Sequence, residues 1–121
     1  MKTKLVYIAF ILLPGIILIY SCSKSYNNPM PMSMGATASV SIQNMAFTPD
    51  TLRIKTGTTV TWNNMDGVTH TVTSLSGLFD SGNLGAGFTF HYTFGMAGTF
   101  AYHDVVHPTM KTAVVIVSNN Y

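Results

Sequence analysis

Apolar residues recur at every second position through most of the chain that follows residue 36. The alternation is clearest in TTVTWNN (58–64), FTFHYTF (88–94) and TFAYH (99–103), and no stretch shows the period of a helix. Side chains at every second position of a strand lie on one face of a sheet, so this pattern predicts half-buried strands. Glycines separate the runs, and short strands divided by turns indicate an all-β antiparallel sandwich or barrel.

The aromatic residues of these runs supply the predicted core, which we expect to contain Phe47, Trp62, Phe88, Phe90 and Phe100. The last run, KTAVVIV from residue 111, is almost continuously apolar. Such a run is typical of a strand that is covered on both faces.

The amino terminus has the layout of an export signal. Lys2 and Lys4 precede an apolar run over residues 5–20, which Pro14 and Gly15 interrupt. The run is shorter than the roughly 20 residues that a membrane-spanning helix needs. We therefore expect a signal peptide over residues 1–21 and an exported protein, with an uncleaved anchor as the alternative.

Cys22 is the only cysteine of the chain, and Ile19-Tyr20-Ser21 precedes it, which resembles the lipoprotein box of bacteria. A lipid on its sulfur would tether the protein to a membrane of the bacterial cell envelope, facing the periplasm or the outer surface. The alternative is an exported free thiol. In both cases the folded domain has no cysteine, and therefore no disulfide and no thiolate ligand.

Residues 22–36 indicate a flexible linker, because SKSYNNPMPMSMGA has two prolines, small polar residues and no periodicity. The globular domain then covers residues 37–121. Two of the six Lys and Arg residues precede Cys22, which leaves four against four Asp and no Glu. A chain that has zero net charge once its leader is removed provides no reason to expect a nucleic acid partner.

The stretch YHDVVHPTM, which begins at Tyr102, gathers polar side chains in one loop. Strand parity places Asp104 on the same face as Tyr102, toward the core, where a carboxylate is costly unless it is paired or bound to a cation. His107 and Met110 follow at intervals of three residues, and His70 lies 34 positions before Asp104 in VTHTVTS. These four residues are the candidate site.

Four stretches of the domain carry a resemblance to a known family. They are AFTPDTLRIKTGTTVTWNNMD, HTVTS, GLFDSGNLGAGFTFHYTF and AGTFAYHDVVHPTMKTAVVIV. In this order they resemble the plastocyanin-like cupredoxins, blue copper proteins of the amicyanin and pseudoazurin type, from about residue 40 to residue 117. The resemblance implies a cupredoxin-like antiparallel Greek-key β-sandwich, copper as the cofactor, and one-electron transfer with a redox partner.

The resemblance also implies a ligand set for copper. His70 matches the first histidine ligand, His107 the second and Met110 the axial thioether, while Asp104 stands where the family has a cysteine. Losing the thiolate removes the copper–sulfur bond that gives the family its colour, and imidazole with carboxylate suits Cu(II) in a tetragonal site, or Zn(II). We expect a pale type 2 site; the alternative is a metal-free ion-pair cluster.

Other polar residues have simpler interpretations. His91 and His103 point away from the ligand face by strand parity and are expected at the surface. Asp80 in FDSG is expected to cap a turn, and Asn64 to hydrogen-bond a loop near the site. Met30, Met32 and Met34 are either soft ligands for Cu(I) or incidental members of the linker.

Three functions are compatible with these features. The first is electron transfer by a lipid-anchored monomer. The second is copper storage or delivery to a copper-acceptor protein, and the third is a metal-free interaction domain. An enzyme is not expected, because the chain offers no pair of nucleophile and base and no phosphate-binding loop.

Overall fold

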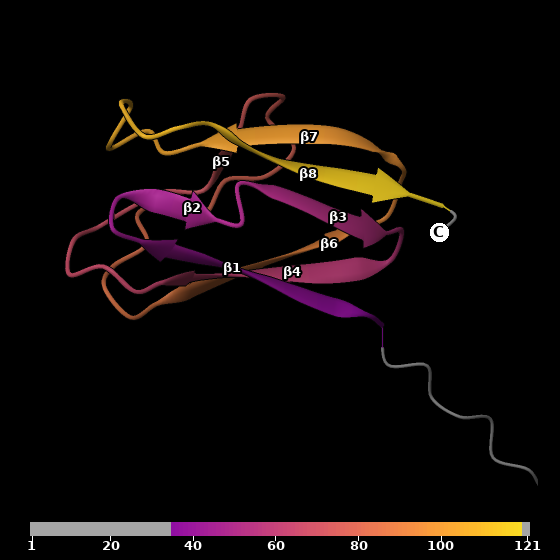
Figure 1. Cartoon of the computed structure of the whole chain (residues 1–121), viewed down its shortest axis with the longest axis horizontal. Helices are drawn as coiled ribbons and strands as arrows, with labels where there is room; N and C mark the ends of the chain where they lie inside the picture. Colours follow the sequence, from indigo (N-terminus) through magenta and orange to yellow (C-terminus); the bar gives the residue numbers. More distant parts are fainter. Residues whose placement is uncertain (1–34, 120–121) are drawn as a thin grey trace, which may run out of the picture. The chain divides into compact units, whose positions relative to one another are not determined.

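A computed structural model describes residues 35–119. Eight strands form two sheets packed face to face (Figure 1). The strands are β1 (Thr37–Gln43), β2 (Ala46–Thr48), β3 (Thr51–Lys55), β4 (Thr58–Asn64), β5 (Thr73–Ser74), β6 (Thr89–Phe94), β7 (Gly98–His103) and β8 (Ala113–Ser118). One sheet has the order β2-β1-β4-β6 and the other β3-β8-β7-β5. The predicted all-β sandwich is confirmed.

Both sheets are mixed rather than purely antiparallel. The pairs β1–β4 and β3–β8 are parallel, whereas the other four pairings are antiparallel. The cause is the path of the chain, which leaves the first sheet after β2, forms β3 in the second sheet and returns for β4. Strands β1 and β4 therefore lie side by side in the same direction.

The core lies between the sheets and is built around Trp62, which is fully buried. Its ring lies 5.5 Å from that of Tyr102 and 5.6 Å from that of Phe79, measured between centroids. Phe47 is buried as predicted, and Phe90 and Phe100 pack against the core. The interior is therefore an aromatic layer contributed by both sheets.

Two details of the predicted core are wrong. Phe88 is 65% exposed, because β6 begins only at Thr89 and strand parity does not extend beyond the end of a strand. Strand β8 alternates buried and half-buried residues instead of being covered on both faces. Its inner face meets the other sheet, and its outer face, with Val114 and Ile116, is only half-buried.

The sandwich has two unlike ends. At one end, called here the site end, β4 and β7 finish and β8 begins, so the loops that carry His70 and Asp104 meet there. At the other, called the distal end, β1 begins and β8 finishes, as Figure 1 shows. Residues 35–119 include no helix with the length and hydropathy to cross a membrane. The predicted signal peptide, Cys22 and the methionines of the linker lie outside the described residues.

Candidate metal centre

The loop after β4 positions His70. The Asn64 side chain, at the end of β4, donates hydrogen bonds to the carbonyls of Val68 (2.8 Å) and Leu84 (2.9 Å), as the sequence predicted for a residue near the site. His70 forms a two-way backbone bridge with Leu84, with N···O distances of 3.0 and 2.8 Å. The imidazole is completely buried, so its orientation is set by the surrounding packing.

The loop after β7 positions Asp104, which is 1% exposed. Its Oδ1 accepts hydrogen bonds from the amides of Thr71 (3.1 Å), Val106 (2.8 Å) and His107 (3.2 Å). Burial acts to raise the pKa of Asp104, but hydrogen bonds from His70 and His107 outweigh it and hold that pKa below its usual value. The carboxylate is therefore a buried anion held by backbone amides.

The second oxygen of this carboxylate faces both imidazoles. Asp104 Oδ2 lies 2.5 Å from His70 Nδ1 and 3.1 Å from His107 Nδ1. The two rings are 4.7 Å apart between centroids, and the three candidate ligand atoms lie within 4.8 Å of one another. The His107 side chain is 25% exposed, so this cluster reaches solvent at one edge.

A second carboxylate, which the sequence analysis missed, holds the far side of His70. Asp66 Oδ2 lies 2.9 Å from His70 Nε2, and the carboxylate also accepts from the amides of Asn44 (2.7 Å) and Met45 (3.0 Å). The Met45 amide is the largest influence that lowers the pKa of Asp66 below its usual value. The sequence signal for this contact is the spacing of Asp66, four residues before His70.

These contacts place acceptor oxygens at both nitrogens of His70. Carboxylates cannot donate when ionised, so His70 satisfies both only by carrying two protons or by sharing one with a carboxyl group. A metal ion on Nδ1 would remove one of these protons and leave Nε2–H to donate to Asp66. This is how metal-bound histidines are commonly oriented.

The other predicted positions differ in their relation to the cluster. Met110 closes the loop, with its amide donating to the His107 carbonyl (3.0 Å), and is buried in the hydrophobic core. His91 is exposed on β6, its Nδ1 2.7 Å from Thr61 Oγ1, and His103 is half-buried on β7. Within the described residues, His70, Asp104 and His107 form the one group of three such side chains that could hold a metal.

Asp80 has the predicted role of a turn cap. Its Oδ1 accepts from the Gly82 amide (2.9 Å) and from Thr73 Oγ1 (3.1 Å). An acceptor two residues before its donor defines a local turn, and both contacts are exposed. Asp80 is therefore a matched reference for Asp66, with a similar number of contacts and none to His70.

The family model of the cupredoxin-like domain matches residues 9–117. The chain belongs to the cupredoxin-like family. It is 33% identical over 82 residues to amicyanin from Paracoccus denitrificans, covering 64% of this chain and 63% of the amicyanin. The predicted membership of the plastocyanin-like cupredoxins is confirmed, and copper is the cofactor that this membership implies.

Solved structures agree with this assignment. A novel purple cupredoxin from Nitrosopumilus maritimus is 34% identical with a TM-score of 0.61, covering 67% of this chain and 99% of that one. An amicyanin variant in its Cu(I) form is 28% identical with a TM-score of 0.64, covering 69% of this chain and 83% of that one. The similarity therefore extends over most of residues 35–119.

Proposed function

We propose that this cupredoxin binds copper through His70, Asp104 and His107, with the Met110 thioether as a further ligand, and transfers single electrons in the cell envelope. The observation that carries this proposal is the convergence of two imidazole nitrogens on one buried carboxylate oxygen. The donors fit the metal, because nitrogen and oxygen ligands suit Cu(II), whereas Cu(I) prefers sulfur. When bound, copper would supply a one-electron couple.

The protein groups divide the remaining tasks. Backbone amides hold Asp104 through Oδ1 and leave Oδ2 for the metal. Asp66 keeps a proton on Nε2 of His70 and so leaves Nδ1 as the ligand atom. His107, at the solvent edge, is the expected point at which an electron passes to or from a redox partner.

Copper storage or delivery is the second candidate. A hard carboxylate in place of the thiolate favours this function, because the carboxylate lowers the affinity for Cu(I). A site that binds Cu(I) weakly is less suited to a fast Cu(II)/Cu(I) couple. The metal-free interaction domain is a third, supported by the hydrogen bonds that already pair Asp104 with both histidines. No enzymatic activity is proposed.

Metal analysis and electron paramagnetic resonance on protein purified without its leader test the site. We expect stoichiometric Cu(II) with a type 2 spectrum, lost in His70→Ala and retained in His91→Ala, which alters an exposed imidazole outside the cluster. A reversible voltammetric couple supports electron transfer, whereas one-way copper transfer to an acceptor supports delivery. If the purified protein takes up no copper, the result would support the metal-free interaction domain.

A lipid on Cys22 is the proposed attachment to the membrane, with residues 1–21 removed as a signal peptide and residues 22–36 as the linker to a monomeric domain. The lipoprotein-like residues before Cys22 support it. The change Cys22→Ala should release the domain from the membrane fraction. Retention of that variant in the membrane would instead support an uncleaved anchor over residues 5–20.

A further inference from the structure

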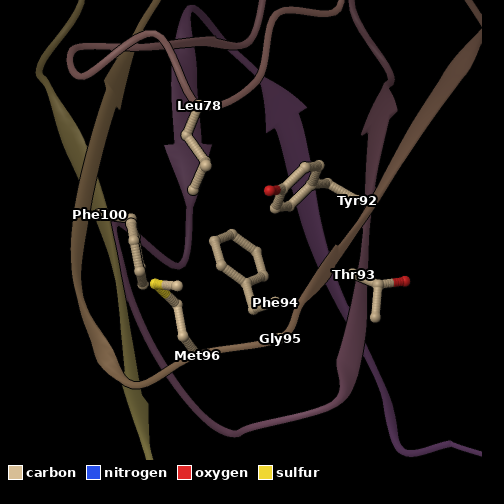
Figure 2. Close-up of a pocket in the computed structure, with 7 residues that line it drawn as sticks. All are labelled: Leu78, Tyr92, Thr93, Phe94, Gly95, Met96 and Phe100. Atoms are coloured by element: carbon tan, nitrogen blue, oxygen red, sulfur yellow. The ribbon is translucent and has the colours of Figure 1, made fainter.

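The distal end of the sandwich carries an apolar pocket of about 390 Å³. It lies between β6, the turn that joins β6 to β7, and Leu78, as Figure 2 shows. Its rim is hydrophobic and open to solvent, because Leu78 is 42% exposed and Met96 is 68% exposed. Phe94 and Phe100 form its walls. The candidate metal centre at the site end uses none of these residues.

The described chain begins at this same end. Thr37 pairs with Thr59 in β4, and Thr59 pairs with Thr93, a residue of the pocket. Twelve residues lie between Cys22 and Gly35, so thirteen residue-to-residue steps join them. These steps can span at most ~45 Å when fully extended. A tether to Cys22 would therefore leave the described domain at the end that carries the pocket, away from the metal centre.

The charged side chains also differ between the two ends, apart from Lys111, which pairs with Asp50 near the site end. Arg53 pairs with Ile116, whose other neighbour is Thr99 at the start of β7, and Lys55 pairs with Ser118 at the distal end. The four aspartates of the chain lie toward the site end, at positions 50, 66, 80 and 104. An anionic lipid surface attracts Arg53 and Lys55 and repels the aspartates.

We propose that the pocket rim is a membrane-contact face, on which Met96 and Leu78 enter the boundary between headgroups and acyl chains. Arg53 and Lys55 lie toward the headgroups, and the metal centre with His107 points away from the bilayer, toward soluble partners. A second copy of the chain is a poorer occupant, because a two-fold pairing at this end would bring like charges together. The proposal rests on the proposed Cys22 anchor for its tether, but on the pocket and charges for its orientation.

Spin labelling of the acylated chain, purified from membranes as the cell processes it, tests this orientation on vesicles of phosphatidylcholine and phosphatidylglycerol. The label is placed at Met96→Cys or, as the matched control, at Phe88→Cys near the site end. These residues are 68% and 65% exposed and flank the same strand. Acylation of Cys22 leaves the introduced thiol as the one that reacts. Collisions of each label with oxygen, which concentrates in the bilayer, and with a water-soluble nickel chelate are measured without copper.

On vesicles, the label at position 96 should gain oxygen collisions and lose nickel collisions relative to the label at position 88. Equal accessibility of both labels overturns the membrane-contact face while leaving the anchor intact. Dipolar broadening between labels at position 96 overturns it in favour of a second copy. A chain without acyl groups that stays bound through residues 5–20 overturns the anchor, and the two labels still decide the orientation. A chain that does not bind vesicles overturns both.

Discussion

Removal of the Asp66 carboxylate should weaken both the fold and the metal centre, because this one group joins them. Its oxygens accept from two amides of the β1–β2 turn, and one of them contacts His70 Nε2 at 2.9 Å. Asn44 and Met45 have φ angles of 54° and 58°, a strained region for residues other than glycine. The Asp66 carboxylate therefore stabilises the β1–β2 turn, whose backbone conformation is unfavourable by itself.

The expected size of the effect follows from these contacts. Hydrogen bonds to a charged group contribute about 1.5–3 kcal/mol each, and the Asp66 side chain is 15% exposed, so partial hydration reduces the sum. For Asp66→Ala we expect about 2–3 kcal/mol of lost unfolding free energy, or roughly 10 °C in melting temperature. Loss of the partner that orients His70 should also weaken Cu(II) binding by about 10–100-fold.

Urea unfolding without metal and competitive Cu(II) titration measure the two effects separately. Asp80→Ala is the control, because Asp80 also accepts from an amide and a hydroxyl but has no contact with the cluster. It should reduce stability modestly and leave the Cu(II) affinity unchanged. If Asp66→Ala destabilises the protein while its copper affinity equals that of Asp80→Ala, the proposed orientation of His70 by Asp66 is wrong.

Two further predictions address other buried groups. The Cu(II) form of Asp104→Cys should be intensely coloured through sulfur-to-copper charge transfer. If the folded, copper-loaded variant has no strong visible band, the loop no longer holds the family's geometry. Burial raises the pKa of Tyr102 to about 12 from 10.0, so the folded state favours the neutral phenol. The resulting stability is complete below pH 10 and is lost as the pH rises toward 12, by about 3 kcal/mol. Tyr102→Phe should remove most of this loss in urea unfolding at pH 9–12, and an unchanged pH dependence would assign it to other groups.

Much of the fold follows from local sequence pattern. Alternation at period two is a property of each strand by itself, so the strands around Trp62 and Phe100 were predictable without tertiary information. The same parity predicted Asp104 on the core side, and the structure has it 1% exposed. Asp104 lies one residue beyond the end of β7, and the amides of Thr71 and Val106 hold its carboxylate there. The family resemblance then supplied the candidate ligands His70 and His107, which the structure brings together on one carboxylate oxygen.

Other features depend on contacts between distant parts of the chain. Phe88 fits the alternation of FTFHYTF yet is exposed, because the point at which β6 begins depends on its pairing with β4. The parallel pairing of β1 with β4 arises from a crossing between sheets that no local pattern encodes. Asp66 has a turn-like sequence context, but its carboxylate accepts hydrogen bonds from the amides of Asn44 and Met45, which lie 21–22 residues earlier in the chain. Local period determines which side of a strand a residue faces, whereas the partner it meets there is decided by tertiary packing.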